Sequence, residues 1–419
     1  MEDLQIKERW LDDDEAAYLK DIGDAGDPSQ ELMTINMGPQ HPSTHGVLRL
    51  IVTLKGEEVV KCESDIGYLH TGIEKSAESK TYNQALTLTD RTDYLSPLIN
   101  NLGYTLAVEK LLGVTDRIPA KATVMRVLLT ELQRISSHLV WLGTHAMDLG
   151  AQSTFLYGMR DREKILDIFE LCSGVRLMTS YIMPGGLYAD IPKGFDTKVA
   201  EFLAYFKKKW PDYGSMLTKS ELWYERTKGV ASITAEEALN WGITGPVLRS
   251  CGVAYDVRKA FPYCGYETYK FEVPTAKTGD VYDRFMVRML EVDQSISLVE
   301  QALNRLPEGE WQIDDLKIVP PKKYQIAVTM ESLIHHFKLY TEGYKPLAGE
   351  VYQRVESARG ELAYYMVSNG TNKPYRMHIR APSFANLQAM GPTLEGRATF
   401  ADIVAAIGSI DIILGEVDR

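Results

Sequence analysis

Cysteine is scarce in this sequence, with four residues in 419, and none lies within four positions of another. The sequence therefore lacks a CxxC pair, the usual source of thiolate ligands for zinc and iron–sulfur clusters. The four residues are Cys62, Cys172, Cys251 and Cys264. Because they are scattered and no export signal precedes them, we expect reduced thiols in the cytoplasm.

Long apolar runs and an excess of basic charge are also missing. No run of about 18 or more apolar residues occurs, so we expect no membrane-spanning helix. Residues 1–30 lack the basic-then-apolar order of a signal peptide, and we expect an acidic extension that is flexible or bound to a partner. The net charge of −11 argues against nucleic acid as a partner, since phosphate binding needs a basic face. The nucleotide-binding motifs GxGxxG and GxxxxGKS/T are absent.

What is present is a globular composition, with 45% hydrophobic and 25% charged residues. Branched and apolar residues predict β segments near both ends, at 32–36, 47–54, 58–62, 349–355, 361–368 and 375–380. Helical periodicity fills the middle, at 119–148, 155–173, 200–217, 279–306 and 332–340. A capping box at 234–237 predicts one more short helix. We expect a predominantly helical α+β fold, built as a single unit over residues 31–419.

Charged and histidine residues on the predicted helix 119–148 have structural interpretations. His138 is expected to be a core histidine. Arg126, Glu131 and Arg134 form either a buried charged row or one that faces solvent or another subunit. The pair His335 and His336 cannot face one direction on a helix, which favours a packing or interface role.

Two of the eight histidines lie four residues apart in the stretch NMGPQHPSTHGVLRL, residues 36–50. A metal site would need both on one helix face, but Pro42 disfavours the helical region for His41. A second interpretation is a loop between strands, with a rigid proline and a permissive Gly46. A third is a loop that handles protons, since histidine titrates near neutral pH. The residues alone leave these interpretations open.

Seven stretches of this sequence resemble the D subunit of bacterial respiratory complex I, the proton-pumping NADH:quinone oxidoreductase. They are MGPQHPSTHGVLRL (37–50), IGYLHTGIEK (66–75), RTDYLSPL (91–98), AVEKLLG (107–113), CGVAYDVRKAFPY (251–263), HHFKLYTEGY (335–344) and GSIDIILGEVDR (408–419). They occur in the order and spacing of that family, and the resemblance runs from about residue 33 to residue 419.

That family is similar in fold to the large subunit of nickel–iron hydrogenases. The resemblance therefore implies a hydrogenase large-subunit-like helical bundle with N- and C-terminal β segments. Hydrogenases hold nickel with two CxxC pairs, and soft thiolates suit such a metal. This sequence has neither pair, and its terminal stretch offers Asp411 but no cysteine. We therefore expect the fold without the hydrogenase chemistry, and no metal or nucleotide bound by this chain.

In the family, the space of the lost nickel site receives a quinone headgroup. That space lies between this subunit and the small B subunit, which carries the terminal four-iron iron–sulfur cluster. By resemblance, His45 and Tyr94 match the headgroup-binding residues, and Asp148 matches the carboxylate that pairs with the histidine. Other positions implied near the cavity or the cluster are His41, His70, Thr71, Met178, Asp411, Ile413 and Arg419. His41 is expected to be structural, and core packing is an equal alternative for Ile413.

The residue types suit the chemistry that this resemblance implies. A quinone takes up two electrons and two protons, and donors aimed at its carbonyl oxygens stabilise the charge that develops there. Tyr94 can offer a phenol and His45 an imidazolium. We hypothesise that Asp148 raises the pKa of His45. Loss of the His45 proton would then rearrange the loop and couple reduction to proton pumping in other subunits.

Three residues that depart from the family pattern bear on the choice of quinone. Thr71 stands where many relatives have arginine, Met178 replaces a histidine near the cluster, and Met183 replaces an arginine. Fewer cations near a cluster lower its reduction potential. This favours menaquinone over ubiquinone, with neutral drift as the alternative.

The resemblance also implies partners and a location. The partners would be subunits B, C and I and the membrane subunits H and A. The chain would be peripheral, on the cytoplasmic face of the bacterial plasma membrane, and not active alone. Two alternatives are the same role in a complex with another electron donor, such as ferredoxin, and a non-catalytic scaffold.

Overall fold

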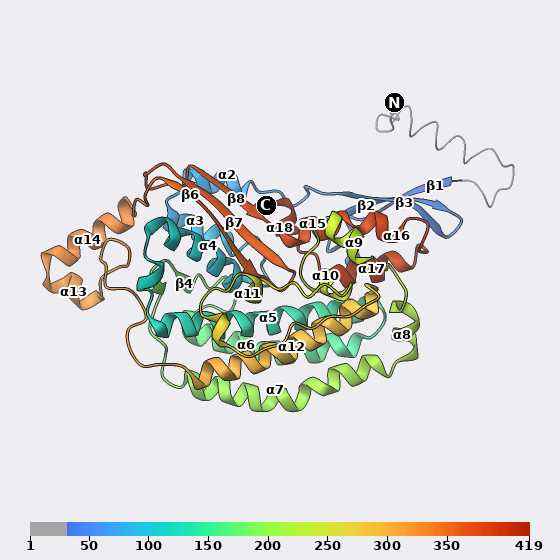
Figure 1. Cartoon of the computed structure of the whole chain (residues 1–419), viewed down its shortest axis with the longest axis horizontal. Helices are drawn as coiled ribbons and strands as arrows, with labels where there is room; N and C mark the ends of the chain where they lie inside the picture. The colour runs from blue at the N-terminus through green and yellow to red at the C-terminus, as the bar shows by residue number, and fades with distance from the viewer. Residues whose placement is uncertain (1–31) are drawn as a thin grey trace, which may run out of the picture.

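The computed structural model describes residues 32–419, which form a mainly helical α+β structure, as predicted. The predicted acidic extension, residues 1–30, lies outside the described residues. Long helices run side by side along the molecule (Figure 1): α5 (Ala120–Asp148), α6 (Gln152–Ser173), α7 (Phe195–Thr218) and α12 (Val281–Asn304). They correspond to the helices expected in the middle of the sequence.

Two antiparallel three-stranded sheets come from the two ends of the chain, as expected. The first sheet contains β1 (Leu32–Met37), β2 (Arg49–Lys55) and β3 (Glu58–Asp65). The second contains β6 (Gly349–Glu356), β7 (Glu361–Ser368) and β8 (Arg376–Arg380). A two-stranded ribbon follows α6, with β4 (Ile182–Met183) and β5 (Gly186–Leu187).

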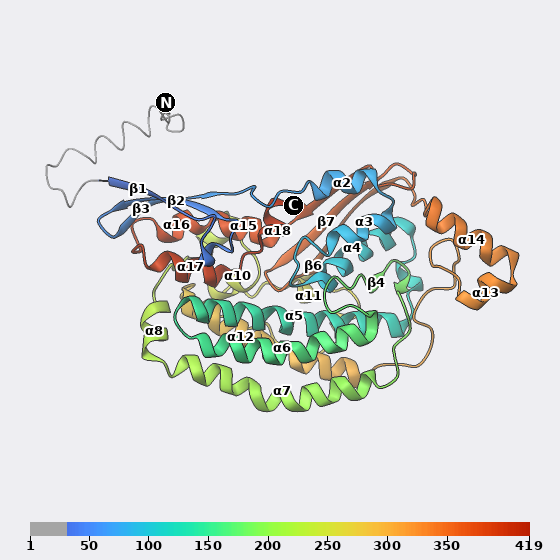
Figure 2. The same cartoon turned by 180° about the vertical axis from the view of Figure 1, so that it is seen from behind.

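Shorter helices join these elements and bring the chain ends together. On the near side of Figure 2 lie α2 (Ile73–Ser79), α3 (Tyr82–Thr89) and α4 (Pro97–Leu112). The middle of the chain adds α8 (Glu221–Thr227), α9 (Ala235–Asn240), α10 (Pro246–Ser250), α11 (Val257–Ala260), α13 (Lys323–Val328) and α14 (Met330–Thr341). The C-terminal part forms α15 (Pro382–Gln388), α16 (Met390–Leu394), α17 (Asp402–Ile410) and α18 (Leu414–Asp418). Short 3-10 helices are η2 (Pro42–Thr44), η3 (Thr115–Arg117) and η4 (Tyr266–Thr268).

Local sequence signals set several of the helix ends. Thr234 and Glu237 form the predicted capping box at α9. Asp280 accepts the free N–H of Asp283 and so begins α12. Pro119 directly precedes the first helical residue of α5, one position earlier than the first-turn place expected from the sequence.

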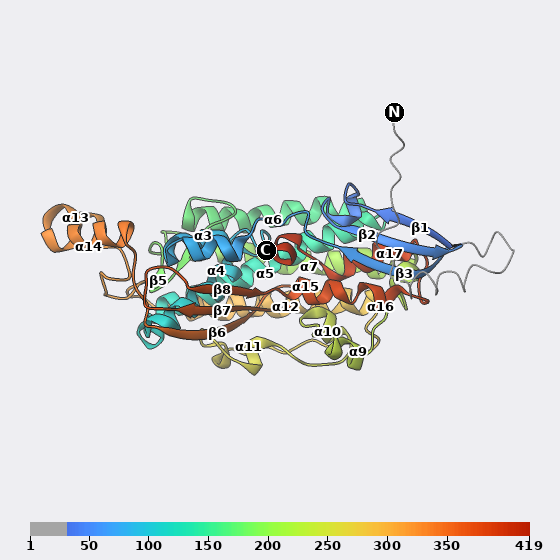
Figure 3. The same ribbon diagram turned by 90° about the horizontal axis from the view of Figure 1, so that it is seen from above.

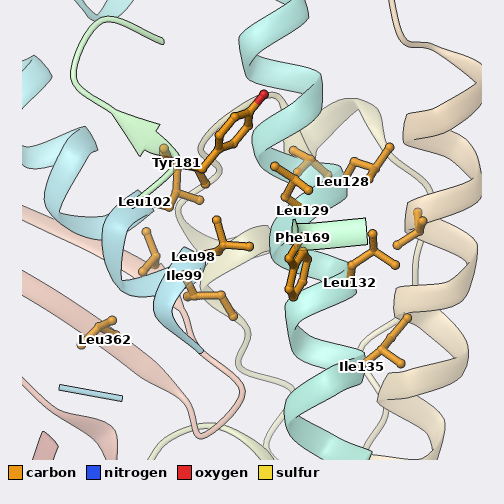
Figure 4. Packing of buried hydrophobic residues seen from close by; sticks show 14 of the residues in the cluster. Leu98, Ile99, Leu102, Leu128, Leu129, Leu132, Ile135, Phe169, Tyr181 and Leu362 are labelled. Atoms are coloured by element: carbon orange, nitrogen blue, oxygen red, sulfur yellow. The ribbon is translucent and has the colours of Figure 1, made fainter. Parts of the chain in front are cut away.

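The main core lies where α4, α5 and α6 meet (Figure 4). Leu98, Leu102, Leu132, Ile135 and Phe169 are each at most 2% exposed and belong to one apolar cluster. Burial of this kind is the dominant favourable term in folding. This apolar packing holds α5 between the other long helices and the C-terminal sheet.

Charged residues also lie inside this core. Arg126, Glu131 and Arg134 are each at most 1% exposed, so the predicted charged row is buried. His138 is equally buried, and its Nε2 atom lies 3.2 Å from a carboxylate oxygen of Glu291. Within residues 32–419, no helix combines the length and the apolar character that crossing a bilayer demands.

Candidate functional site: a histidine, a tyrosine and a buried arginine

The histidine loop joins β1 to β2 and is held by its own backbone. Buried Thr44 in η2 donates a hydrogen bond to the carbonyl oxygen of His41 (2.9 Å). Gly38 has a φ of 87°, and a Cβ atom there would lie 2.1 Å from the carbonyl oxygen of Leu48. Glycine is therefore required at this close approach, and it fixes the path of the loop.

The two histidines of the loop do different things. The Nδ1 atom of His41 accepts a hydrogen bond from the N–H of Ser43 (3.2 Å) and so caps η2. This agrees with the structural role expected for His41. His45 ends η2 with left-handed backbone geometry (φ 56°), and its side chain is exposed. His45 is therefore the histidine that the loop presents outward.

The charge beside His45 is a cation rather than a carboxylate. The partial loss of contact with water disfavours the charged imidazole and lowers the pKa of His45. The positive charge of Arg359 lowers it further, as a smaller effect. The expected rise of this pKa through Asp148 is therefore wrong. Asp148 ends α5, and burial raises its pKa, while the nearby charge of His41 opposes that rise. The histidine charge that acts on Asp148 is thus that of His41.

Tyr94 lies half-buried in the loop 90–96 between α3 and α4. Burial, followed by the negative charge of Asp93, raises the pKa of Tyr94, so its phenol is neutral at physiological pH. One oxygen of Asp93 accepts the N–H of Leu95 (3.1 Å), and the other accepts a hydrogen bond from Arg359 (3.1 Å). These bonds fix the loop on both sides of the tyrosine.

Arg359 lies in the turn between β6 and β7 and is fully buried. Its guanidinium donates hydrogen bonds to four side chains from three parts of the chain: Asp93, Ser96, Ser137 and Asp411. A planar group with five donors is held in one orientation by such a set of acceptors. The charge of Arg359 acts on both His45 and Tyr94. The fold thereby brings His45, Tyr94 and Asp411 around one cation.

The C-terminal segment supplies carboxylates to the same region. Asp411 has left-handed backbone geometry (φ 58°), and burial raises its pKa to about 6 against the pull of Arg359. Burial, followed by the charge of Asp93, raises the pKa of Glu416 to about 7. Ile413 is 1% exposed, as its core-packing alternative predicts. In this segment the two residues with shifted pKa values are thus Asp411 and Glu416.

The last helix packs directly on the loop that carries Tyr94. A Cβ atom at Gly415 would lie 2.7 Å from the carbonyl oxygen of Thr92. Beyond it, Arg419 donates to the carbonyl oxygen of Ile379 (2.7 Å) and accepts the N–H of Ile73 (3.2 Å) at its own carbonyl oxygen. The end of the chain is therefore anchored through both side chain and backbone.

His70, Thr71 and Met178 lie in segments next to these. The Nδ1 atom of His70 lies 2.6 Å from the carbonyl oxygen of Asp418, and Thr71 is exposed. Met178 has left-handed backbone geometry (φ 47°) between α6 and β4. Two residues later, Ser180 donates a hydrogen bond to Asp90, the first residue of the loop 90–96 that carries Tyr94. His70 is thus tied to the C-terminus, and the Met178 segment is tied to the Tyr94 loop.

Sequence reasoning missed Arg359, Asp93 and Glu416. Arg359 lies in the stretch ESARGE, residues 356–361, between two predicted strands. Charged residues in such a turn usually face solvent, so the local pattern gives no sign that this one is buried. Only the packing of segments that are distant in the sequence shows that the charge of Arg359 acts on both His45 and Tyr94.

The fold and this site define a helical α+β protein in which the charge of one buried arginine acts on a histidine and a tyrosine. The model of a family described as "Respiratory-chain NADH dehydrogenase, 49 Kd subunit" matches residues 148–419. The chain is 59% identical over 393 residues to the second D subunit of the NADH-quinone oxidoreductase of Roseiflexus sp. (strain RS-1), covering 93% of this chain and 94% of that protein. It is 52% identical over 391 residues to the D subunit of the NADH-quinone oxidoreductase of Geotalea uraniireducens (strain Rf4), covering 93% and 100%.

These similarities extend over nearly the whole chain. The chain belongs to the family of the 49 kDa subunit of respiratory-chain NADH dehydrogenase, which the resemblance of its motifs predicted. It is a subunit of an oxidoreductase complex of this kind.

Proposed function

We propose that this chain forms one side of the quinone-reducing site of a proton-translocating NADH:quinone oxidoreductase, with the B subunit forming the other side. The observation that carries the proposal is the convergence of exposed His45 and half-buried Tyr94 on the charge of Arg359. A buried cation whose charge reaches two hydrogen-bonding side chains suits a substrate that becomes negatively charged as it is reduced.

The reaction adds two electrons and two protons to the quinone to give the quinol. The electrons arrive from the terminal iron–sulfur cluster of the B subunit. Tyr94, whose pKa is raised, keeps its proton and donates a hydrogen bond to one carbonyl oxygen. The charge of Arg359 stabilises negative charge at the same place, because low polarity strengthens such an interaction.

The sequence predicted that Asp148 raises the pKa of His45 and so keeps its proton in place. We propose instead that His45 takes up its proton during the reaction. Because its pKa is lowered, His45 is neutral at pH 7 before the substrate is reduced. Negative charge on the substrate raises the pKa of His45, so His45 takes a proton from water at that moment and passes it to one reduced oxygen, while the second proton enters from water directly. We propose that this change of charge moves the histidine loop, and with it His41 and Asp148. Movement of the loop then couples reduction to proton pumping in the membrane subunits.

We further propose menaquinone rather than ubiquinone as the substrate. Met178 and Thr71 supply no cation where many relatives have one, and this lowers the potential of the nearby cluster. A redox titration should place that cluster below the cluster of ubiquinone-using relatives. An equal potential would leave the two substitutions without this role.

The proposed setting is the cytoplasmic face of the bacterial plasma membrane, with subunits B, C and I and the membrane subunits H and A as partners. A related complex fed by another donor, such as ferredoxin, is the alternative. The subunits that co-purify with the complex separate the two. A non-catalytic scaffold is disfavoured because His45 and Tyr94 both lie at the charge of Arg359.

The direct test compares Tyr94→Phe and Tyr94→Ala in membranes. We expect Tyr94→Ala to abolish inhibitor-sensitive quinone reduction, and Tyr94→Phe to lower its rate by roughly 10² or more, the usual cost of removing one hydrogen-bond donor from a developing negative charge. NADH:ferricyanide reduction, which bypasses the quinone site, reports assembly and should persist in both. Wild-type quinone reduction in both variants would reject the site.

A further inference from the structure

Glu416 is a buried carboxyl group that the proposed reaction does not use. It lies in α18 and is 0% exposed. One carboxyl oxygen, Oε1, accepts the N–H of Ser383 in the first turn of α15 (3.0 Å). The other, Oε2, has no hydrogen-bond partner among residues 32–419. Because a buried carboxylate oxygen without a donor is costly, this environment favours the protonated form.

Arg359 is a cation that faces Glu416, but its hydrogen bonds go to other groups. The guanidinium attracts Asp411 most strongly, then Asp93, and Glu416 after both. Asp93 and Asp411 each form an ion pair with it, at 3.1 Å and 3.2 Å. Glu416 therefore shares Arg359 with two carboxyl groups that bond to it directly.

The other elements around Glu416 do not replace this cation. The helix α15 carries no charged residue, and Tyr364 on β7, which also faces Glu416, has a raised pKa and a neutral phenol. The nearby charged side chains are bonded elsewhere: Asp418 to the N–H groups of Gly67 and Leu69, Arg419 to the carbonyl oxygen of Ile379, and Arg91 to the carbonyl oxygen of Thr87. The charge state of Glu416 is thus set mainly by burial and by Asp93.

These surroundings make Glu416 titrate near neutral pH. Burial, followed by the negative charge of Asp93, raises the pKa of Glu416 to about 7, while Ser383 and Arg359 act in the opposite direction. The proton stabilises the folded contact fully below the ordinary pKa of 4.5, and this stability is lost as the pH rises through about 7.

The charge of Glu416 appears at the contact between α18 and the loop that carries Tyr94. Figure 3 shows α18 near the middle of the molecule, between the first sheet and the helices α3 and α4. Gly415 packs so closely on the loop that a Cβ atom there would lie 2.7 Å from the carbonyl oxygen of Thr92, the residue before Asp93. Because a close-packed contact screens charge poorly, repulsion between Glu416 and Asp93 acts directly on this loop.

We propose that Glu416 is a positioning residue for Tyr94, and that its proton sets how tightly α18 packs on the loop 90–96. With the proton, Glu416 is neutral beside Asp93 and the contact is closed. Without it, two carboxylates face each other, and α18 loosens from the loop. The loosening follows from the contacts of this chain alone, whereas its effect on quinone reduction rests on the proposed function.

Hydrogen exchange of the amides of α18 and the loop 90–96, in the assembled complex, measures this contact. After correction for the chemical exchange rate, opening should be roughly tenfold more frequent at pH 8 than at pH 6, because the pKa lies at about 7. Glu416→Gln keeps the acceptor for Ser383 but cannot ionise, so its opening should be equal at both pH values. Glu308→Gln, at an exposed position, should behave like the wild type. Equal opening at both pH values in the wild type, or a change that persists in Glu416→Gln, would overturn the proposal.

The pH profile of quinone reduction, relative to ferricyanide reduction, tests the link to Tyr94. Above pH 7 the rate should fall further in the wild type than in Glu416→Gln. If α18 loosened but the two profiles coincided, the positioning role would be overturned. That result would leave the quinone site itself standing, since Tyr94→Phe tests the site separately.

Discussion

At the scale of single residues, Asp411 links charge in the protein interior to chemistry at the surface. Its pKa of about 6 means that it gains negative charge as the pH rises through that value. This charge opposes Arg359, which lowers the pKa of His45. Ionisation of Asp411 should therefore make His45 easier to protonate above pH 6.

Asp411→Asn tests this link, since asparagine tolerates the left-handed backbone at this position (φ 58°). The permanently neutral side chain should remove the inflection near pH 6 from the pH profile of quinone reduction. At pH 7 the rate should fall, because an unopposed Arg359 makes His45 harder to protonate. Asp314→Asn, at an exposed position, is the matched control. An inflection that persists in Asp411→Asn would exclude Asp411 as its source.

At the scale of elements, the close packing of α18 on the loop that carries Tyr94 fixes the shape of the site. Gly415→Ala should push the helix off the carbonyl oxygen of Thr92, at a cost of about 1–3 kcal/mol, as overpacking does. Quinone reduction should fall more than ferricyanide reduction. Gly214→Ala in α7 meets only an ordinary contact at 3.6 Å and should be tolerated. Equal rates of quinone reduction in Gly415→Ala and Gly214→Ala would show that α18 is not closely packed on the Tyr94 loop.

The sequence predicted the helices and strands themselves, but it did not predict which distant segments contact one another. The periodic residues of α5 and α12 and the capping box that begins at Thr234 predicted helices close to those observed. Strand alternation located both sheets for the same reason, since local patterns report which face is buried. The partner of His45 could not be predicted, because Arg359 reaches it only through the packing of distant segments. The resemblance named His45 and Asp148, but the charges beside them had to come from the structure.

At the scale of the whole molecule, buried charges join the helices beneath the site into one network. Glu131 on α5 accepts hydrogen bonds from Arg258 (3.0 Å), Tyr266 (2.6 Å) and Ser295 (2.7 Å), which come from α11, η4 and α12. Its pKa is lowered to about 2, because the attraction of Arg134 and Arg258 outweighs the cost of burial. Glu131 therefore joins three elements of the scaffold, which other buried ion pairs such as Arg258–Asp256 also hold.

Glu131→Gln should destabilise this scaffold by about 3–5 kcal/mol, since two guanidinium groups would lose a buried partner. A carboxylate with a lowered pKa stabilises the fold fully above its ordinary pKa of 4.5, and this stability is lost as the pH falls through about 2. The deficit of the variant should thus be complete at pH 7 and shrink below pH 4.5. Hydrogen exchange of the α5 amides in the assembled complex measures it, with Glu308→Gln, at an exposed position, as the control. If α5 exchanged equally slowly in both variants at pH 7, the helices would be held by their apolar contacts alone.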